Sequence, residues 1–309
     1  MCECFFSSRT DGASAVCCSL ANTDVSFQAA KPRIIIHWSR AQWDRPVTFA
    51  RSAILAIGIL GLAQAAAQEL VTLEPRAGIK QSYLLDIPDS GKPQAIVVLF
   101  PGGGGSIRLR LEQDQIKFSP GNFLVRSRRH FVEHGIAAAV VDAPSDQAGG
   151  MSDGFRSGDK HAADIAAVTA DLKRRLPGVP VYFVGTSRGT VSAAYAATRV
   201  EGLAGVVLSS SLFNASRAGE AGLSGFDYSK LKVPLLFVHH VDDACRFTPY
   251  HTAKRLSDSY PLISVRGGKP PTSDPCEAFS AHGFLGKESE TVDAMAKWML
   301  KQPYPKEVE

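Results

Sequence analysis

The stretch VPVYFVGTSRGTVSAAYAA, residues 179–197, carries the strongest structural signal in this sequence of 309 residues. It begins with a short apolar run rich in β-branched side chains, which predicts a buried strand. The run breaks at Gly185, and a small-residue pattern typical of a closely packed helix begins just after Ser187. Gly185 and Gly189 flank the serine at positions where a side chain would collide with the neighbouring backbone. The stretch therefore predicts a tight strand-to-helix turn that holds up Ser187.

A second apolar run, AIVVLFPGGGGS at residues 95–106, predicts a buried strand that leads into four consecutive glycines at 102–105. Such a loop can turn its backbone N–H groups toward a ligand. Acyl transfer through a serine places negative charge on the former carbonyl oxygen, which needs donors of this kind already in position. A flexible loop and a phosphate-binding loop are the alternatives, but no Lys-Ser/Thr pair follows the glycines as a P-loop requires.

On these two features the sequence resembles the α/β-hydrolase superfamily of serine hydrolases. The G-x-S-x-G turn of that superfamily is matched by residues 185–189, although an ordinary glycine-rich turn has the same spacing. The resemblance covers about residues 70–300. It implies that Ser187 is the nucleophile, and that the oxyanion donors are the N–H of Arg188 and that of Gly103 or Gly104.

Many members of the superfamily carry a His-Gly-x-x-Asp pattern after a later strand, which this sequence predicts at residues 234–239. Laid on the chain, the pattern places His239 at the histidine and Asp243 at the acid. His240 stands in place of the glycine, so Asp242 remains an alternative acid. The adjacent histidines suggest a metal site, but no further His or Cys-x-x-Cys ligand spacing accompanies them, and we expect no metal.

The base follows the acid in this fold, and only His251 and His282 follow Asp243. His251 falls at the start of a predicted helix, facing solvent or its helical neighbours. His282 lies in SAHGFLGKE, after a predicted strand at residues 262–266 and before the last predicted helix, where the superfamily places its base. The resemblance thus implies a triad of Ser187, Asp243 and His282, in which the aspartate holds the imidazole in the right tautomer. Such a triad needs no cofactor.

The N-terminal quarter of the chain differs from the rest. Overall the composition is that of a soluble globular protein, with 45% hydrophobic residues, 21% charged residues and a net charge of +4, and it does not indicate nucleic-acid or membrane binding. Residues 47–67 combine Arg51, about eleven apolar residues and A-x-A sites, the pattern of a secretory signal peptide. The apolar run is too short for a membrane span, and an internal apolar helix is the alternative. Residues 1–46 lack apolar periodicity, and we expect them to lie outside the working protein, with translation starting near Val47.

The placement of the cysteines agrees with export. Four of the six cysteines lie upstream of the predicted cleavage, which leaves Cys245 and Cys276. One pair in an exported protein predicts one disulfide, with two free buried thiols as the alternative. The bond would tie the segment after Asp243 to the segment before His282. Closing a loop of about 32 residues contributes about 3–4 kcal/mol in the chain-entropy model.

Residues 68–309 are predicted to form one α/β domain. Its strands and helices alternate, which predicts a mostly parallel sheet covered by helices on both faces and an active site at the carboxyl ends of the strands. Residues 214–232 leave room for little or no cap, and the cleft walls would come from residues 107–122 and 143–160. Strands are predicted at 70–75, 79–88, 96–100, 137–142, 203–210, 234–239 and 262–266, and helices at 123–134, 161–176, 252–257 and 288–300.

The sequence therefore favours an exported serine hydrolase, secreted or periplasmic, that cleaves small-molecule carboxylic esters through an acyl-enzyme at Ser187. A peptidase or amidase with the same triad is one alternative, because the motifs are the same for both reactions. A non-catalytic binding protein on a hydrolase fold is the other. The complete triad and the glycine run argue against it, since an inactive relative has no need to keep them.

Overall fold

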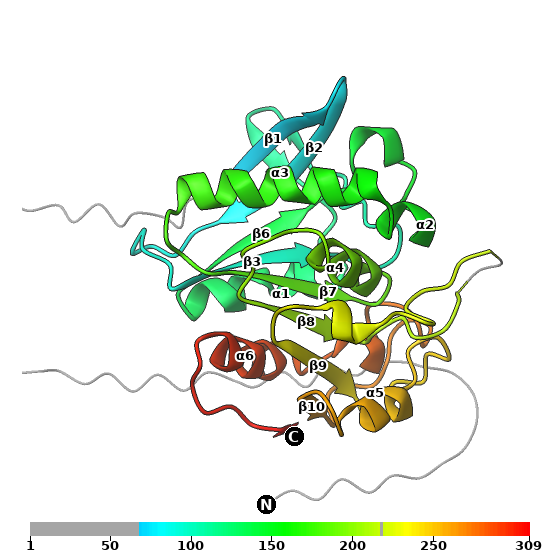
Figure 1. Cartoon of the computed structure of the whole chain (residues 1–309). Helices are drawn as coiled ribbons and strands as arrows, with labels where there is room; N and C mark the ends of the chain where they lie inside the picture. Colours follow the sequence, from blue (N-terminus) through cyan, green and yellow to red (C-terminus); the bar gives the residue numbers. More distant parts are fainter. Residues whose placement is uncertain (1–67, 217–218) are drawn as a thin grey trace, which may run out of the picture. The chain divides into compact units, whose positions relative to one another are not determined.

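The computed structural model describes residues 68–216 and 219–309, so the predicted extension (1–46) and signal peptide (47–67) lie outside the described residues. Nine strands within this described part form one sheet in the order β1-β2-β6-β3-β7-β8-β9-β10-β11 (Figure 1). β2 runs antiparallel to both of its neighbours, and the strands from β6 to β11 are parallel. The strands are β1 (Gln68–Arg76), β2 (Ile79–Asp86), β3 (Ala95–Phe100), β6 (Ile136–Val141), β7 (Val181–Thr186), β8 (Gly205–Ser209), β9 (Leu235–His240), β10 (Leu262–Val265) and β11 (Glu307–Val308).

Helices cover both faces of this sheet (Figure 1). Helices α3 and α4 share one hydrophobic cluster with alternate side chains of β3, among them Ile96 and Val98. Helices α1 and α6 share the opposite cluster with the intervening side chains, such as Val97 and Leu99. Strand β3 is therefore buried on both faces, which explains its continuous apolar sequence. The helices are α1 (Phe123–Glu133), α2 (Asp153–Arg156), α3 (Asp159–Arg175), α4 (Gly189–Ala197), α5 (Tyr250–Leu256) and α6 (Glu288–Met299).

The predicted fold class is confirmed, with element bounds that differ by a few residues. Between β8 and β9, the described residues form only loops and the short 3-10 helix η2 (Tyr228–Lys230), so the domain carries little or no cap there. The sequence did not predict the hairpin of β4 (Arg110–Glu112) and β5 (Gln115–Lys117). Each of these strands has only three residues, which is too short for an alternation of apolar and polar residues to be recognised.

The two glycines around Ser187 are required by close packing at the turn between β7 and α4. A Cβ atom on Gly185 would lie 2.5 Å from the carbonyl oxygen of Gly189. A Cβ atom on Gly189 would collide with the backbone of Phe100 at the end of β3. The strand, the helix and the neighbouring strand therefore meet at distances that only glycine permits.

Replacing Gly185 with alanine is expected to destabilise the protein by about 1–3 kcal/mol, because backbone atoms rather than a flexible side chain must give way. The measurement is the free energy of unfolding in urea. Gly149→Ala is the matched control, since a Cβ there meets nothing within 4 Å and the backbone is not left-handed. Equal stability of the two variants would contradict the close-packing argument.

Candidate active site

Ser187 sits at the apex of the turn that the sequence predicted, between the end of β7 and the start of α4. Its φ angle is +53°, in the left-handed region that a non-glycine residue occupies only when the surrounding structure holds it there. The backbone N–H donates to the carbonyl oxygen of Ser209 at 3.0 Å, and the carbonyl accepts from the N–H of Thr190 at 2.9 Å. The turn thereby fixes the serine at the carboxyl end of the sheet.

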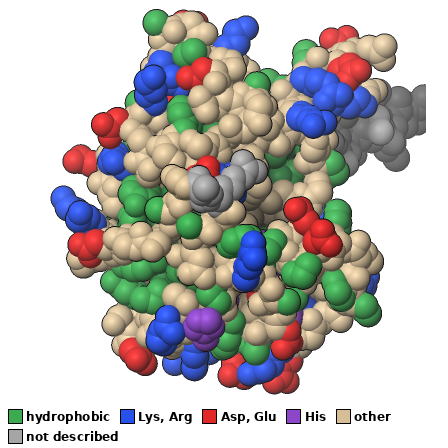
Figure 2. Space-filling view, turned by 90° about the vertical axis from the view of Figure 1, so that its right-hand side faces the viewer, with side chains coloured by type: hydrophobic (Ala, Val, Ile, Leu, Met, Phe, Trp, Pro, Cys, Tyr) green, Lys and Arg blue, Asp and Glu red, His purple; other side chains and the backbone are tan. Residues whose placement is uncertain are grey.

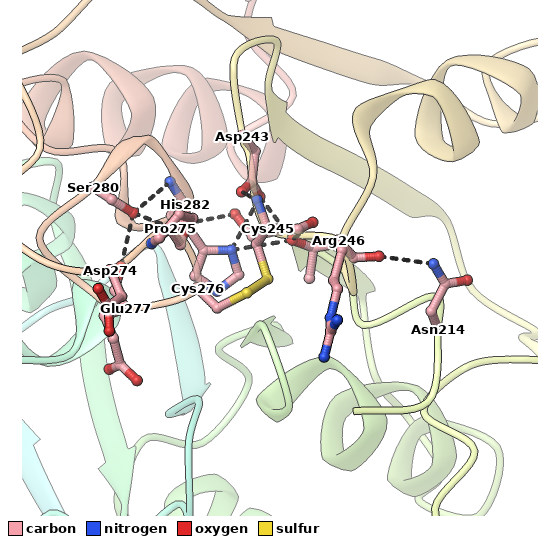
Figure 3. Close-up of a disulfide and its surroundings, with 12 residues drawn as sticks. Asn214, Asp243, Cys245, Arg246, Asp274, Pro275, Cys276, Glu277, Ser280 and His282 are labelled. Atoms are coloured by element: carbon pink, nitrogen blue, oxygen red, sulfur yellow. Dashed lines mark hydrogen bonds and ion pairs between the residues drawn. A yellow bond between two sulfur atoms is a disulfide. The ribbon is translucent and has the colours of Figure 1, made fainter. Parts of the chain in front are cut away.

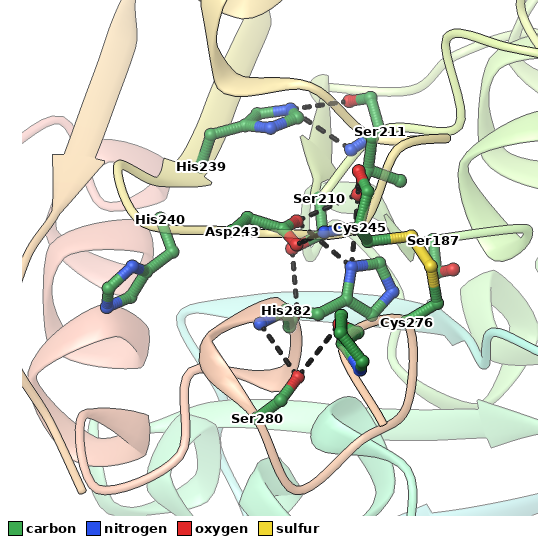
Figure 4. Close-up of polar contacts among 12 residues, drawn as sticks. Ser187, Ser210, Ser211, His239, His240, Asp243, Cys245, Cys276, Ser280 and His282 are labelled. Carbon is green, nitrogen blue, oxygen red and sulfur yellow. Dashed lines mark hydrogen bonds and ion pairs between the residues drawn. A yellow bond between two sulfur atoms is a disulfide. The ribbon is translucent and has the colours of Figure 1, made fainter. Parts of the chain in front are cut away.

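His282, in the short 3-10 helix η3 (Ala281–Gly283), and Asp243, in the loop after β9, come together (Figure 4). His282 Nδ1 lies 3.0 Å from Asp243 Oδ2, and the aspartate side chain has no exposed surface. Thr248 Oγ1 donates to the same carboxylate oxygen at 2.8 Å and lies 3.1 Å from His282 Nδ1. Because both neighbours of Nδ1 present lone pairs, Nδ1 carries the proton and Nε2 is the free acceptor. Asp242, the alternative acid, is exposed, and its backbone N–H bonds to His240 Nδ1.

The loop that carries His282 is held by hydrogen bonds to its backbone. Ser280 Oγ accepts from the His282 N–H at 3.2 Å, and Ser210 Oγ donates to the His282 carbonyl at 2.8 Å. Gly283 packs so closely on Ala278 that a Cβ atom there would overlap the Ala278 carbonyl. Arg126, on α1, donates to the carbonyls of Ala278 and Gly283. These contacts fix the backbone of the segment that carries the imidazole.

Cys245 and Cys276 form a disulfide, in agreement with the prediction from the cysteine count (Figure 3). Both half-cystines line the same cavity as Ser187 and His282. The Cys245 N–H also donates to Asp243 Oδ1 at 2.9 Å, so the cross-link begins at the residue that holds the carboxylate. The bond thus ties the acid segment to the segment that leads into His282.

Ser187 and His282 line one cavity of about 660 Å³, together with the three residues implied as oxyanion donors, Gly103, Gly104 and Arg188. Within the described part of the chain, none of the three donor N–H groups has a backbone or side-chain acceptor, so they are available to a ligand. The structure brings Ser187 and His282 to this cavity without a direct hydrogen bond between their side chains. Hydrogen bonds of this kind are often long in an unliganded site and tighten when substrate binds.

The other two histidines of the predicted acid region hold the backbone in place. Ser211 N–H donates to His239 Nε2 at 3.0 Å, and burial lowers the pKa of His239 to about 3, so this ring stays neutral. His240 Nε2 donates to the Gly267 carbonyl at 2.9 Å. Among residues 68–216 and 219–309, no cluster of three His, Cys, Asp or Glu side chains could hold a metal ion.

Three residues at the site were missed by sequence reasoning, namely Thr248, Ser210 and Arg156. Thr248 and Ser210 are fully buried and contact the Asp243 and His282 loops. Arg156 is 1% exposed and donates to the carbonyl of Gly103 at 3.0 Å. Hydroxyl residues are common in loops, and an arginine is usually exposed, so nothing in the sequence distinguishes these three.

The surface around the cavity lies at the carboxyl ends of the parallel strands, the side seen in Figure 2. Hydrophobic and charged side chains are interspersed on this face (Figure 2). Aromatic rings line the cavity at Phe123, Phe247 and Phe279, of which Phe279 is 42% exposed. Arg188 turns its side chain away into a buried ion pair with Asp153 and Glu220.

Of the helices in the described residues, none is both long and apolar enough for a membrane span.

Comparison with known proteins gives a likeness in structure only. No family model matches the sequence, and no curated protein matches it. The structure is similar to a cold-adapted esterase from an Arctic intertidal metagenomic library, with a TM-score of 0.50 and 15% identity over 76% of this chain and 93% of that one. It is similar to a dienelactone hydrolase from Anabaena variabilis, with a TM-score of 0.51 and 16% identity over 76% and 96%. It is also similar to an α/β serine hydrolase homologue from Coxiella burnetii, with a TM-score of 0.50 and 11% identity over 75% and 96%. By its sheet order, its helices on both faces and these likenesses, the chain has the α/β-hydrolase fold.

Proposed function

We propose that this protein is a serine hydrolase that cleaves carboxylic esters of small molecules. The observation that carries the proposal is the convergence of three groups on one cavity. These are a serine at a left-handed turn, a histidine whose Nδ1 contacts a buried carboxylate, and backbone N–H groups without an acceptor in the described residues. Each group supplies a different part of acyl transfer, so their convergence is hard to explain by folding alone.

In the proposed reaction, Ser187 Oγ forms a bond to the ester carbonyl carbon while His282 Nε2 takes the hydroxyl proton. The carbonyl electrons move to oxygen, which the N–H groups of Arg188 and of Gly103 or Gly104 stabilise. The intermediate collapses, the C–O bond to the alcohol breaks, and His282 gives its proton to the leaving oxygen. Water then repeats the sequence on the acyl-enzyme and releases the acid and the free serine.

Esters are proposed ahead of amides on two grounds. One of the similar structures is described as an esterase and another as a dienelactone hydrolase, although at 15% and 16% identity these names do not transfer by themselves. The cavity is lined by phenylalanine rings and carries few charges, which suits an apolar acyl or alcohol group.

Export to a secreted or periplasmic location is part of the proposal, supported by the Cys245–Cys276 bond, because disulfides persist in oxidising compartments.

A fluorophosphonate probe applied to fractions of cells that express the full chain tests both parts. We expect a labelled band in the exported fraction at the size of residues 68–309, and no labelled band with Ser187→Ala. Hydrolysis of p-nitrophenyl acetate and butyrate, compared with aminoacyl anilides, then separates esterase from peptidase. Failure of folded wild-type protein to label would refute the hydrolase, whereas labelling confined to the cytosol would refute export alone.

A further inference from the structure

A buried arginine lies directly behind the glycine loop. Arg156, the last residue of α2, is 1% exposed and has no carboxylate within ion-pair distance among the described residues. Its Nη1 donates to Ser192 Oγ at 2.7 Å, and its Nη2 donates to the carbonyl oxygen of Gly103 at 3.0 Å. Burial and the neighbouring Arg188 cation lower the pKa of Arg156 to about 9, so the group still carries its charge near pH 7. Burying a cation without a paired carboxylate costs free energy, which its hydrogen bonds to Ser192 and Gly103 partly offset.

The peptide bond that Arg156 contacts includes one of the two glycine donors. The carbonyl of Gly103 and the N–H of Gly104 belong to one planar trans peptide and point in opposite directions. Drawing the carbonyl toward Arg156 therefore turns the Gly104 N–H away from the guanidinium, and this N–H has no acceptor among the described residues. A charged donor on the carbonyl also polarises the peptide, which makes its N–H a stronger donor.

The loop sequence is fitted to this arginine. A Cβ atom on Gly105 would lie 2.6 Å from Arg156 Nη2 and would also overlap the Met151 side chain. Gly103 and Gly105 both have positive φ angles, +59° and +79°. The next peptide is held as well, because the Met151 N–H donates to the Gly104 carbonyl at 2.9 Å. The close approach of Arg156 and Met151 thus explains Gly105, and the left-handed backbone explains Gly103.

We infer that Arg156 is a positioning residue for the oxyanion site, and this inference rests on the proposed function. It acts through the Gly103 carbonyl, by fixing and polarising the peptide whose Gly104 N–H stabilises the tetrahedral intermediate. The same short helix also holds the second donor residue, since Asp153 accepts from the Arg188 side chain at 2.8 Å. Helix α2 therefore anchors both sides of the oxyanion site.

The test compares Arg156→Met and Arg156→Lys with wild type on p-nitrophenyl butyrate. We expect Arg156→Met to lower kcat by about 10- to 100-fold, part of the loss that follows removal of a donor, with KM changed less than about threefold. Arg156→Lys keeps the charge and is expected to recover part of kcat. Arg128→Met is the matched control, because Arg128 is also buried and also bonds to a backbone carbonyl, that of Val125. It is expected to lose stability and keep kcat within about twofold.

A second readout separates positioning from general damage. A trifluoromethyl ketone adds Ser187 Oγ to its carbonyl and carries an oxyanion, whereas the matching methyl ketone binds without reacting. In Arg156→Met the inhibition constant of the first is expected to rise by the same factor by which kcat/KM falls, and that of the second to stay unchanged. Equal weakening of both ketones, or an unchanged kcat, would overturn the inference.

Arg156→Met leaves the Gly103 carbonyl and Ser192 Oγ without their donor and can fail to fold. In that case Ser192→Ala takes its place, since it removes one bond that orients the guanidinium. We expect Ser192→Ala to lower kcat by about 3- to 10-fold with KM unchanged. Wild-type kcat in folded Ser192→Ala would count against the inference. A wild-type protein that neither labels nor hydrolyses esters would instead overturn the proposed function.

Discussion

Alanine at Ser187 or at His282 is expected to lower kcat on a p-nitrophenyl ester by about four to six orders of magnitude, and alanine at both is expected to cost no more than either alone. The reason is that the hydroxyl attacks only when the imidazole takes its proton, so the two groups act as one unit. The residual rate over uncatalysed hydrolysis would come from the oxyanion donors and the cavity. Single-turnover kinetics on the three variants measure this directly.

His251→Ala is the matched control for this experiment. His251 is exposed on α5 and has no partner among the hydrogen bonds of the described side chains, so its loss is expected to change kcat less than twofold. Additive losses in the double variant would contradict a shared role for Ser187 and His282. Circular dichroism on each protein checks that the loss is chemical, because the His282 backbone keeps its bonds to Ser210 and Ser280 in the alanine variant.

Asp243→Asn is expected to lower kcat by about 10³- to 10⁴-fold at neutral pH, which is the second-largest effect. The Cys245 N–H is a fixed donor to Oδ1, so the new side chain keeps its carbonyl oxygen there and places its NH₂ at the Oδ2 position. That NH₂ faces His282 Nδ1, and Thr248 can rotate its hydroxyl to accept from it. The imidazole would then carry its proton on Nε2, where it cannot accept one from Ser187.

Asp242→Asn is the matched control, because the two aspartates are adjacent and the substitution removes the same charge. The Asp242 side chain is exposed and makes no hydrogen bond within the described residues, so kcat is expected to stay within about twofold of wild type. The pair is compared by steady-state kinetics and by the ¹⁵N chemical shifts of the imidazole, which report the tautomer directly. Equal losses in the two variants would exclude Asp243 as the specific partner of the histidine.

The sequence predicted the elements whose physics is local. Gly185 and Gly189 could be recognised in the sequence because a side chain at either position collides with the backbone. The apolar run of β3 could be recognised because both faces of that strand are buried. The placement of Asp243 and His282 on loops after successive strands also followed, since parallel strands bring their carboxyl ends together. The Cys245–Cys276 pairing was predicted because these are the two cysteines downstream of the predicted cleavage site.

The contacts that hold the loops could not be predicted from the sequence, because most of them join residues that are distant in sequence and of common types. Arg156 lies 53 residues after Gly103, and the bond between them depends on where α2 lies against the glycine loop. Thr248 follows Asp243 by five residues, but its hydroxyl reaches the carboxylate only because the intervening chain turns back on itself. The hairpin of β4 and β5 was not predicted for a different reason, since strands of three residues are too short to show a hydrophobic period.

The Cys245–Cys276 bond adds a covalent link between the acid and base segments, and an oxidation must form that link. Inside a cell, where thiols are kept reduced, those segments would lack the covalent link and keep the hydrogen bonds among Asp243, Thr248 and His282. A copy that never leaves its producer is therefore expected to be the slower catalyst. On the proposed function, the cross-link would serve as a safeguard that spares the producer's own esters until the protein has been secreted.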